Sequence, residues 1–120
     1  MPHDLYPPAT PAMGDRRRAL APDVHEAFDE FSRRVFADGA LPSVSKQLIA
    51  VAVAHVTQCP YCIRGHTQLA HRAGATDAQV MEAIWVAAEM RAGAAFAHAA
   101  IALEALPAEA ATETLPPTSV

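Results

Sequence analysis

The segment from residue 41 to about residue 58 places the tightest limit on the fold. A helix here would be apolar on most of its circumference, because its apolar residues are Leu48, Ile49, Val51, Ala52, Val53 and Val56. A helix of that kind is typical of a position that is buried on several sides. The sequence therefore predicts that other helices pack around this central one.

Other apolar residues repeat at three- and four-residue spacing on both sides of the central segment. Hydrophobic residues make up 52% of the chain, many of them alanine, and aromatic residues only 6%. This balance favours closely packed helices over a sheet of β-branched strands. We therefore predict a compact all-α fold of about five to six helices, with helices over about 23–37, 41–58, 60–74, 77–90 and 94–106.

The two ends of the chain differ in composition from its middle. With 120 residues the chain is expected to form a single domain over 1–120. Residues 1 to about 21 are predicted to be a proline-rich arm, because Pro2, Pro7, Pro8 and Pro11 block a long helix. Residues 108–120 are expected to be a flexible tail. We expect the chemistry to lie between these two ends.

Charge and hydropathy exclude several classes of function. The formal net charge is −4, and the basic residues form no stripe with interleaved aromatic residues, so no nucleic-acid partner is expected. The one basic run, Arg16 to Arg18, is interpreted as a solvated leader into the first helix. No signal peptide and no apolar run of bilayer length is evident, so we expect a cytoplasmic protein with no membrane partner.

The octapeptide from Cys59 to His66, Cys-Pro-Tyr-Cys-Ile-Arg-Gly-His, contains both cysteines of the chain. Cys59 and Cys62 are three residues apart, and Cys62 and His66 are four apart, so a helix would carry all three on one face. Pro60 favours a first helical turn at this point. The thiols are thus predicted at a helix N-terminus, which together with an imidazole can lower a thiol pKa from about 8.5 by one to several units.

This arrangement predicts thiol redox chemistry. Cys62 is the better placed thiol for activation, because it lies in the first turn and His66 can accept its proton. Cys59 could then attack a sulfenic acid on Cys62 and close a disulfide, which an outside dithiol would reduce by exchange. The expected substrate is a small hydroperoxide, and no cofactor is expected beyond the redox-active disulfide Cys59–Cys62.

Two other interpretations of the same residues stay open. Zinc could be held by Cys59, Cys62 and His66, with His55 or His71 as a fourth ligand. The thiols could also be buried as small hydrophobic groups beside a core histidine. A thioredoxin-like interpretation is weaker, because that motif expects strands alternating with helices and none are predicted.

Four stretches resemble one family: the run from Lys46 to Ala50, the Cys-x-x-Cys-x-x-x-His element, the Ala-Gly-Ala-Thr run at 73–76 and the helix around Trp85. Together they are similar to the carboxymuconolactone decarboxylase superfamily, in its AhpD-like alkyl hydroperoxidase branch. The resemblance implies an all-helical fold, antioxidant thiol chemistry and assembly as a homotrimer or homohexamer. By that similarity Cys62 reacts with peroxide, Cys59 resolves, and His66 belongs to a proton relay.

The sequence departs from the pattern of that branch at two positions. Gln47 stands where the relay usually has a glutamate, and Tyr61 where a histidine is often found. An amide can form hydrogen bonds but cannot take up a proton, and a phenol is a poor base near neutral pH. His55, at the end of the central segment, could shuttle a proton instead. Further alternatives are a protein or lipoyl disulfide oxidoreductase, with a dithiol or lipoyl-type partner, and a lyase acting on a lactone acid.

Overall fold

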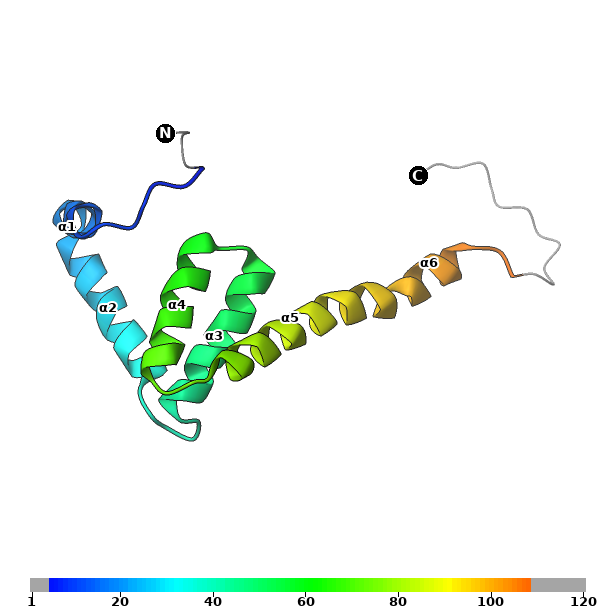
Figure 1. Cartoon of the computed structure of the whole chain (residues 1–120). Coiled ribbons are helices and arrows are strands. Elements are labelled where there is room, and N and C mark those ends of the chain that lie inside the picture. The colour runs from blue at the N-terminus through cyan, green and yellow to red at the C-terminus, as the bar shows by residue number, and fades with distance from the viewer. Residues whose placement is uncertain (1–4, 109–120) are drawn as a thin grey trace.

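The computed structural model describes residues 5–108. Within this part the chain forms helices and no strands, which confirms the all-α prediction (Figure 1). The helices are α1 (Pro11–Leu20), α2 (Pro22–Phe36), α3 (Ser43–Thr57), α4 (Pro60–Arg72), α5 (Asp77–Ala97) and α6 (Ala99–Ala105).

Helix α3 lies at the centre of the packed part, as the sequence predicts. It packs against α4 on one side and the first half of α5 on another, and α2 touches it as well (Figure 1). The core is small: Val51, Ala70 and Ala75 are buried together, with Val44, Leu48, Val80 and Ile84 packed against them. Small alanine side chains at these contacts allow close approach of the helices.

Local sequence signals set several helix ends. The Thr76 hydroxyl accepts a hydrogen bond from the backbone of Gln79, whose side chain in turn accepts one from the backbone of Thr76, so α5 starts with a capping box. Gly74, just after the end of α4, has φ of +104°, which glycine adopts without strain, and there the chain turns out of the helix. The predicted starts and stops of α2, α3 and α4 agree with the structure within two residues.

Two predicted boundaries are wrong. The N-terminal arm contains a regular helix, α1, because Thr10 caps it by accepting a hydrogen bond from Met13 and Pro11 fits its first position. The break predicted between residues 90 and 94 is absent, and α5 continues through Gly93 to Ala97. The predicted tail at 108–120 lies outside the described residues except for residue 108.

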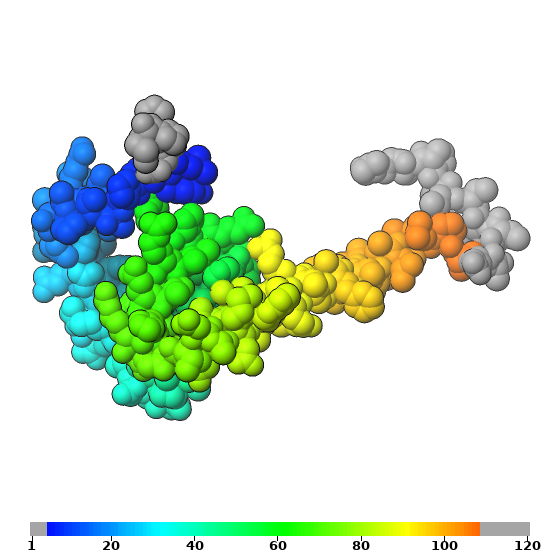
Figure 2. Space-filling view, viewed as in Figure 1, coloured from blue at the N-terminus to red at the C-terminus, as the bar shows by residue number. Residues whose placement is uncertain are grey.

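The single chain is less compact than the sequence suggests, although the all-helical architecture is as predicted. Half of α5 and all of α6 project away from the packed helices as a rod (Figure 2). The molecule measures 66 × 36 × 34 Å and has a radius of gyration of 21.8 Å. A compact domain of this length would have a radius of gyration of about 14 Å. The chain alone therefore does not fold its apolar segments around a single core.

Many large apolar side chains are consequently exposed. On α3, Ile49 and Val53 are 50% and 52% exposed, so one side of the central helix is left open to solvent in the single chain. Trp85 on α5 is 65% exposed and Phe96 83%. The apolar face of α2 is exposed as well, at Val24, Phe28, Phe31 and Val35. By length and composition alone, the segment Asp77–Ala105 would suffice to cross a membrane, a test that core helices of soluble proteins also pass.

Candidate functional site: a dithiol at the start of helix α4

A tight reversal between α3 and α4 positions the two thiols. Gln58 adopts a left-handed backbone conformation, with φ of 59° and ψ of 45°, and the backbone N–H of Cys59 donates to the carbonyl of Ala54 at 3.2 Å. The Arg91 guanidinium from α5 donates to the Val56 carbonyl at 2.8 Å and so satisfies a free carbonyl at the end of α3. The chain is thereby fixed just before the first cysteine.

Cys59 is the N-cap residue of α4, and Pro60 occupies the first helical position, as the sequence predicts. The backbone N–H of Cys62 donates to Sγ of Cys59 at 3.2 Å. A sulfur atom here takes the place of the serine or aspartate oxygen that usually caps a helix. Both cysteines are free and half-buried, so the dithiol is reduced and open to solvent.

The two thiols differ in acidity. Hydrogen bonds from the Cys62 thiol and the Cys62 backbone N–H lower the pKa of Cys59 below its ordinary value. The pKa of Cys62 is raised, because its thiol donates to Cys59 and because burial disfavours its charge. The sequence favoured Cys62 as the activated thiol, but the structure places the lowered pKa on Cys59. The main reason is that the Cys62 thiol donates to Cys59, and the capping position adds the backbone N–H groups of Cys62 and Tyr61.

This difference predicts the order of alkylation. Because the thiolate is the reactive form, Cys59 should react with iodoacetamide several-fold faster than Cys62 at pH 7. As the pH rises through the lowered pKa of Cys59, its rate should level off, so the ratio of the two rates should fall toward one in alkaline solution. Cys62 should gain reactivity only in alkaline solution. Peptide mass spectrometry after brief labelling measures both rates. In urea the two rates should converge, and equal rates in the folded protein would contradict the assignment.

His66 lies one turn beyond Cys62 and is held by two side chains. Its Nδ1 is 2.8 Å from Oε1 of Gln47 on α3, and its ring stacks on Phe36 of α2 with 5.1 Å between ring centroids. The amide oxygen only accepts hydrogen bonds, so Nδ1 carries the proton and donates. Nε2 of the neutral ring is then left with a free lone pair. Gln47 is 6% exposed and is the buried polar residue of the core.

The structure thus pairs Cys59 with Cys62 and His66 with Gln47, and it holds His55 and Tyr61 by other contacts. Nδ1 of His55 is 2.8 Å from the Val51 carbonyl one turn earlier, so its ring is tied to its own helix and not to a thiol. The Tyr61 hydroxyl donates to the carbonyl of Pro7 at 2.5 Å. Neither side chain forms a hydrogen bond with a cysteine in the described part of the chain.

Sequence reasoning missed two contributors to the site. Phe36, which stacks on His66, lies thirty residues earlier at the end of α2, and no local pattern pairs the two. The segment before α1 contacts the start of α4, where the Tyr6 and Tyr61 rings meet edge to face at 5.9 Å. Figure 1 shows this segment, in dark blue, passing the end of α4 where that helix begins. The aromatic character of Tyr6 is the sequence signal from which its contact with Tyr61 could have been found.

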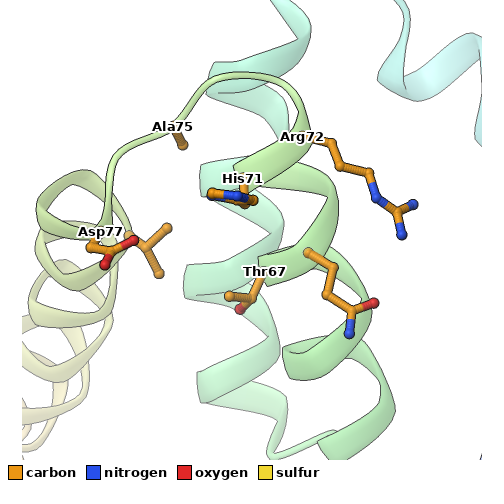
Figure 3. A pocket seen from close by; sticks show the side chains of 7 residues that line it. Thr67, His71, Arg72, Ala75 and Asp77 are labelled. Atoms are coloured by element: carbon orange, nitrogen blue, oxygen red, sulfur yellow. The ribbon is translucent and has the colours of Figure 1, made fainter.

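The zinc alternative gains no support from the geometry. Across residues 5–108, no three histidine, cysteine or acidic side chains come together in a group that could hold a metal ion. His71, a possible fourth ligand, lies with Thr67 at a separate hollow of about 600 Å³ between α4 and the start of α5 (Figure 3). In that view Arg72 points away from α5. The hollow does not include either thiol.

Comparisons with known proteins agree with this architecture. A family model described as "Carboxymuconolactone decarboxylase family" matches residues 22–105. "Uncharacterized protein 4 in cox locus" of Paracoccus denitrificans is 63% identical over 100 residues, which cover 83% of this chain and 89% of that protein. An uncharacterised protein of Cupriavidus necator is 37% identical over 82 residues, 68% of this chain and 73% of its own length.

Two solved structures are also similar to the chain. A carboxymuconolactone decarboxylase family protein from Legionella pneumophila, in its apo form, superposes with a TM-score of 0.65 and 34% identity, covering 78% of this chain and 84% of that one. A protein from Methanobacterium thermoautotrophicum has the same TM-score of 0.65 at 37% identity, covering 69% and 93%.

Proposed function

The chain belongs to the carboxymuconolactone decarboxylase family, and from that membership and the free dithiol at the start of α4 we propose that it is a thiol-dependent peroxidase of the AhpD-like type. The observation that carries the proposal is the pair Cys59 and Cys62 at a helix N-terminus. A hydrogen bond joins the two residues, and their pKa values are shifted in opposite directions. A paired, reduced and accessible dithiol is what a cycle between dithiol and disulfide requires.

In the first half of the proposed cycle, His66 takes the proton of the Cys62 thiol through its free Nε2. The Cys62 thiolate attacks one oxygen of the hydroperoxide, so that an S–O bond forms and the O–O bond breaks. His66 returns the proton to the departing alkoxide, which leaves as an alcohol. Cys62 is oxidised to a sulfenic acid and the peroxide is reduced.

In the second half, Cys59 attacks the Cys62 sulfur. The backbone N–H groups of Cys62 and Tyr61, which help to lower the pKa of Cys59 in the dithiol, remain in place and favour its thiolate. The S–S bond forms, the S–O bond breaks, and hydroxide leaves as water after taking a proton from solvent. A dithiol or lipoyl-type reductant then opens the disulfide by exchange and is itself oxidised to a disulfide. A cytoplasmic location suits this cycle, because thiols stay reduced there.

The amide of Gln47 determines how His66 handles the proton in this cycle. A glutamate at that position would favour a charged imidazole, whereas the amide only fixes the ring and its tautomer. His66 then both accepts and returns a proton without help from a second acid. We therefore expect a slower enzyme than one with a carboxylate there, with the same order of steps.

A second candidate function uses the same thiols on a different substrate. Cys59 is half-buried, caps its helix and has a lowered pKa, which are the properties of a thiol that attacks protein or lipoyl disulfides. In that reaction the reduced dithiol would open the partner's disulfide and end as the Cys59–Cys62 bridge. This oxidoreductase role does not need peroxide.

We also propose that the working form is a homotrimer or homohexamer. The chain exposes 9936 Å², whereas a compact monomer of this mass would expose about 6,200 Å². The excess of roughly 3,700 Å² falls in the range that permanent interfaces bury. Helix α5 supports this, because it is apolar on nearly all sides and yet only Ala87 on it is buried.

Titration of thiols tests the peroxidase. The reduced protein should lose two free thiols per chain when one equivalent of hydrogen peroxide is added, and intact-mass analysis should show the loss of two hydrogens with no added oxygen. With a dithiol such as dihydrolipoamide present, peroxide should be consumed in steady state. Reduction of lipoamide with no reaction toward any peroxide would favour the disulfide oxidoreductase, and thiols unchanged in both assays would remove both functions and leave the lyase.

A further inference from the structure

A second cavity lies at the start of α4, where it is lined by the two residues between the cysteines but by neither thiol. Its volume is about 590 Å³, and it is enclosed between the segment before α1 and the outer face of α4. The segment contributes Leu5, Tyr6, Pro7, Pro8 and Ala9, and α4 contributes Pro60, Tyr61, Arg64, Gly65 and Gln68. The size is that of cavities that bind small organic molecules.

The wall formed by the N-terminal segment is fixed to α4. The Tyr61 hydroxyl donates to the Pro7 carbonyl, and the Tyr6 ring meets the Tyr61 ring edge to face, with an interplanar angle of 84°. Tyr61 is the residue between the two cysteines in sequence, next to Cys62. Space-filling atoms of this segment lie against the start of α4 in Figure 2.

Gly65 forms part of the floor of this cavity and has no evident structural purpose. It lies inside α4, where glycine costs about 1 kcal/mol relative to alanine. A Cβ atom added there would meet nothing within 4 Å, so no neighbouring helix requires its small size. The fold therefore does not explain a glycine here, whereas a ligand that approaches the backbone closely would.

Among the described residues, the lining has a single charged group. Arg64 contributes a guanidinium, while most other lining residues are apolar or aromatic. A guanidinium pairs with a carboxylate through two parallel hydrogen bonds, and the apolar walls favour a hydrocarbon or aromatic body. We propose that this cavity binds an organic acid with an apolar body, its carboxylate paired with Arg64 and its body lying over Gly65.

The position of the cavity connects this ligand to the thiols. Gly65 and Cys62 are three residues apart in α4, so they are neighbours on its surface. A ligand that lies over Gly65 therefore reaches the edge of the helix face that carries Cys62. If the proposed peroxidase function holds, the substrate class is a hydroperoxide that carries a carboxylate, and this part of the proposal rests on that function.

Binding to the reduced full-length protein tests the site without any reaction. In an ¹⁵N NMR titration, octanoate should shift the amide signals of Gly65 and its neighbours in α4 until the site is saturated. Octanol should bind at least about tenfold more weakly, because it lacks the carboxylate that pairs with Arg64. Arg64→Gln should weaken octanoate binding about as much. Arg72→Gln, a matched change on the same helix outside this cavity, should leave octanoate affinity unchanged.

Gly65→Leu should abolish octanoate binding by covering the backbone over which the ligand lies, and it should fold because a Cβ atom at this position meets nothing within 4 Å. Gly65→Ala should weaken binding less. Shifts confined to the exposed apolar residues of α5 and α6, or equal affinities for octanoate and octanol, would overturn the proposal.

Turnover provides the second readout. The ratio of kcat/KM for linoleic acid hydroperoxide to that for its methyl ester should exceed one and should fall about tenfold in Arg64→Gln, whereas Arg72→Gln should keep the wild-type ratio. A ratio of one in the active wild-type enzyme would overturn the substrate class. If no hydroperoxide is reduced at all, the peroxidase function is wrong. The octanoate titration then still tests whether the cavity binds an organic acid.

Discussion

Cys62→Ser is expected to reduce peroxide consumption to the level of the protein-free mixture. A serine hydroxyl does not ionise at neutral pH and cannot form a sulfenic acid, so the first step of the proposed cycle is lost. The change should not disturb the fold, because the backbone N–H that Cys62 donates to Cys59 remains. Steady-state assays with hydrogen peroxide and dihydrolipoamide, together with circular dichroism, measure both effects.

Cys59→Ser is the matched variant and should behave differently. It should still consume one equivalent of peroxide per chain and then stop, because the sulfenic acid on Cys62 has no partner sulfur. Intact-mass analysis should find one added oxygen. Serine is a good N-cap, so α4 should stay folded. If instead Cys59→Ser is inert and Cys62→Ser is oxidised once, Cys59 is the residue that attacks peroxide, an order that its lowered pKa would also permit.

The dithiol could be predicted from the sequence because its geometry is local. The spacing of Cys59, Cys62 and His66 and the preference of Pro60 for a first helical turn depend only on the path of one helix. The capping box at Thr76 and the glycine turn at Gly74 are local in the same way. Each of these features needs no knowledge of the rest of the fold.

The surroundings of the dithiol depend on contacts between distant segments, so the sequence could not supply them. Phe36 reaches His66 only because α2 packs near α3 and α4, and Pro7 reaches Tyr61 across 54 residues. The order of the two thiol pKa values depends on which sulfur caps the helix, and the predicted spacing fits either. The resemblance supplied the pairing of Gln47 with His66, which no local pattern indicates.

The apolar faces that are exposed in the single chain have a different explanation. An apolar pattern indicates that a face avoids water but not which chain covers it. Val24, Phe28, Phe31 and Val35 on α2 have the spacing of a buried face and are exposed in the single chain. Trp85 and Phe96 on α5 are exposed as well. If these faces meet in an assembly, the pattern was interpreted correctly and only the location of the core was wrong.

Charges placed on the α5 rod are therefore expected to dissociate the assembly, which is the second large effect. In sedimentation velocity, wild-type protein should have three or six times the mass of one chain at micromolar concentration. The double variant Trp85→Asp, Phe96→Asp should sediment mainly as a monomer, because buried aromatic anchors contribute about 2 kcal/mol or more each at protein interfaces and a buried carboxylate adds a further penalty. Its thermal unfolding should also shift to lower temperature, since the small core around Val51 would stand alone.

Met13→Asp provides the control for this experiment. It adds the same charge at a side chain that is 41% exposed on α1, away from the rod, and should keep the assembly. A wild-type protein that is monomeric, or that floats with phosphatidylcholine vesicles through Asp77–Ala105 instead of self-associating, would contradict the oligomer. An assembly that survives both aspartates would mean that the rod lies outside the interface, and the exposed face of α2 would then have to hold the subunits together.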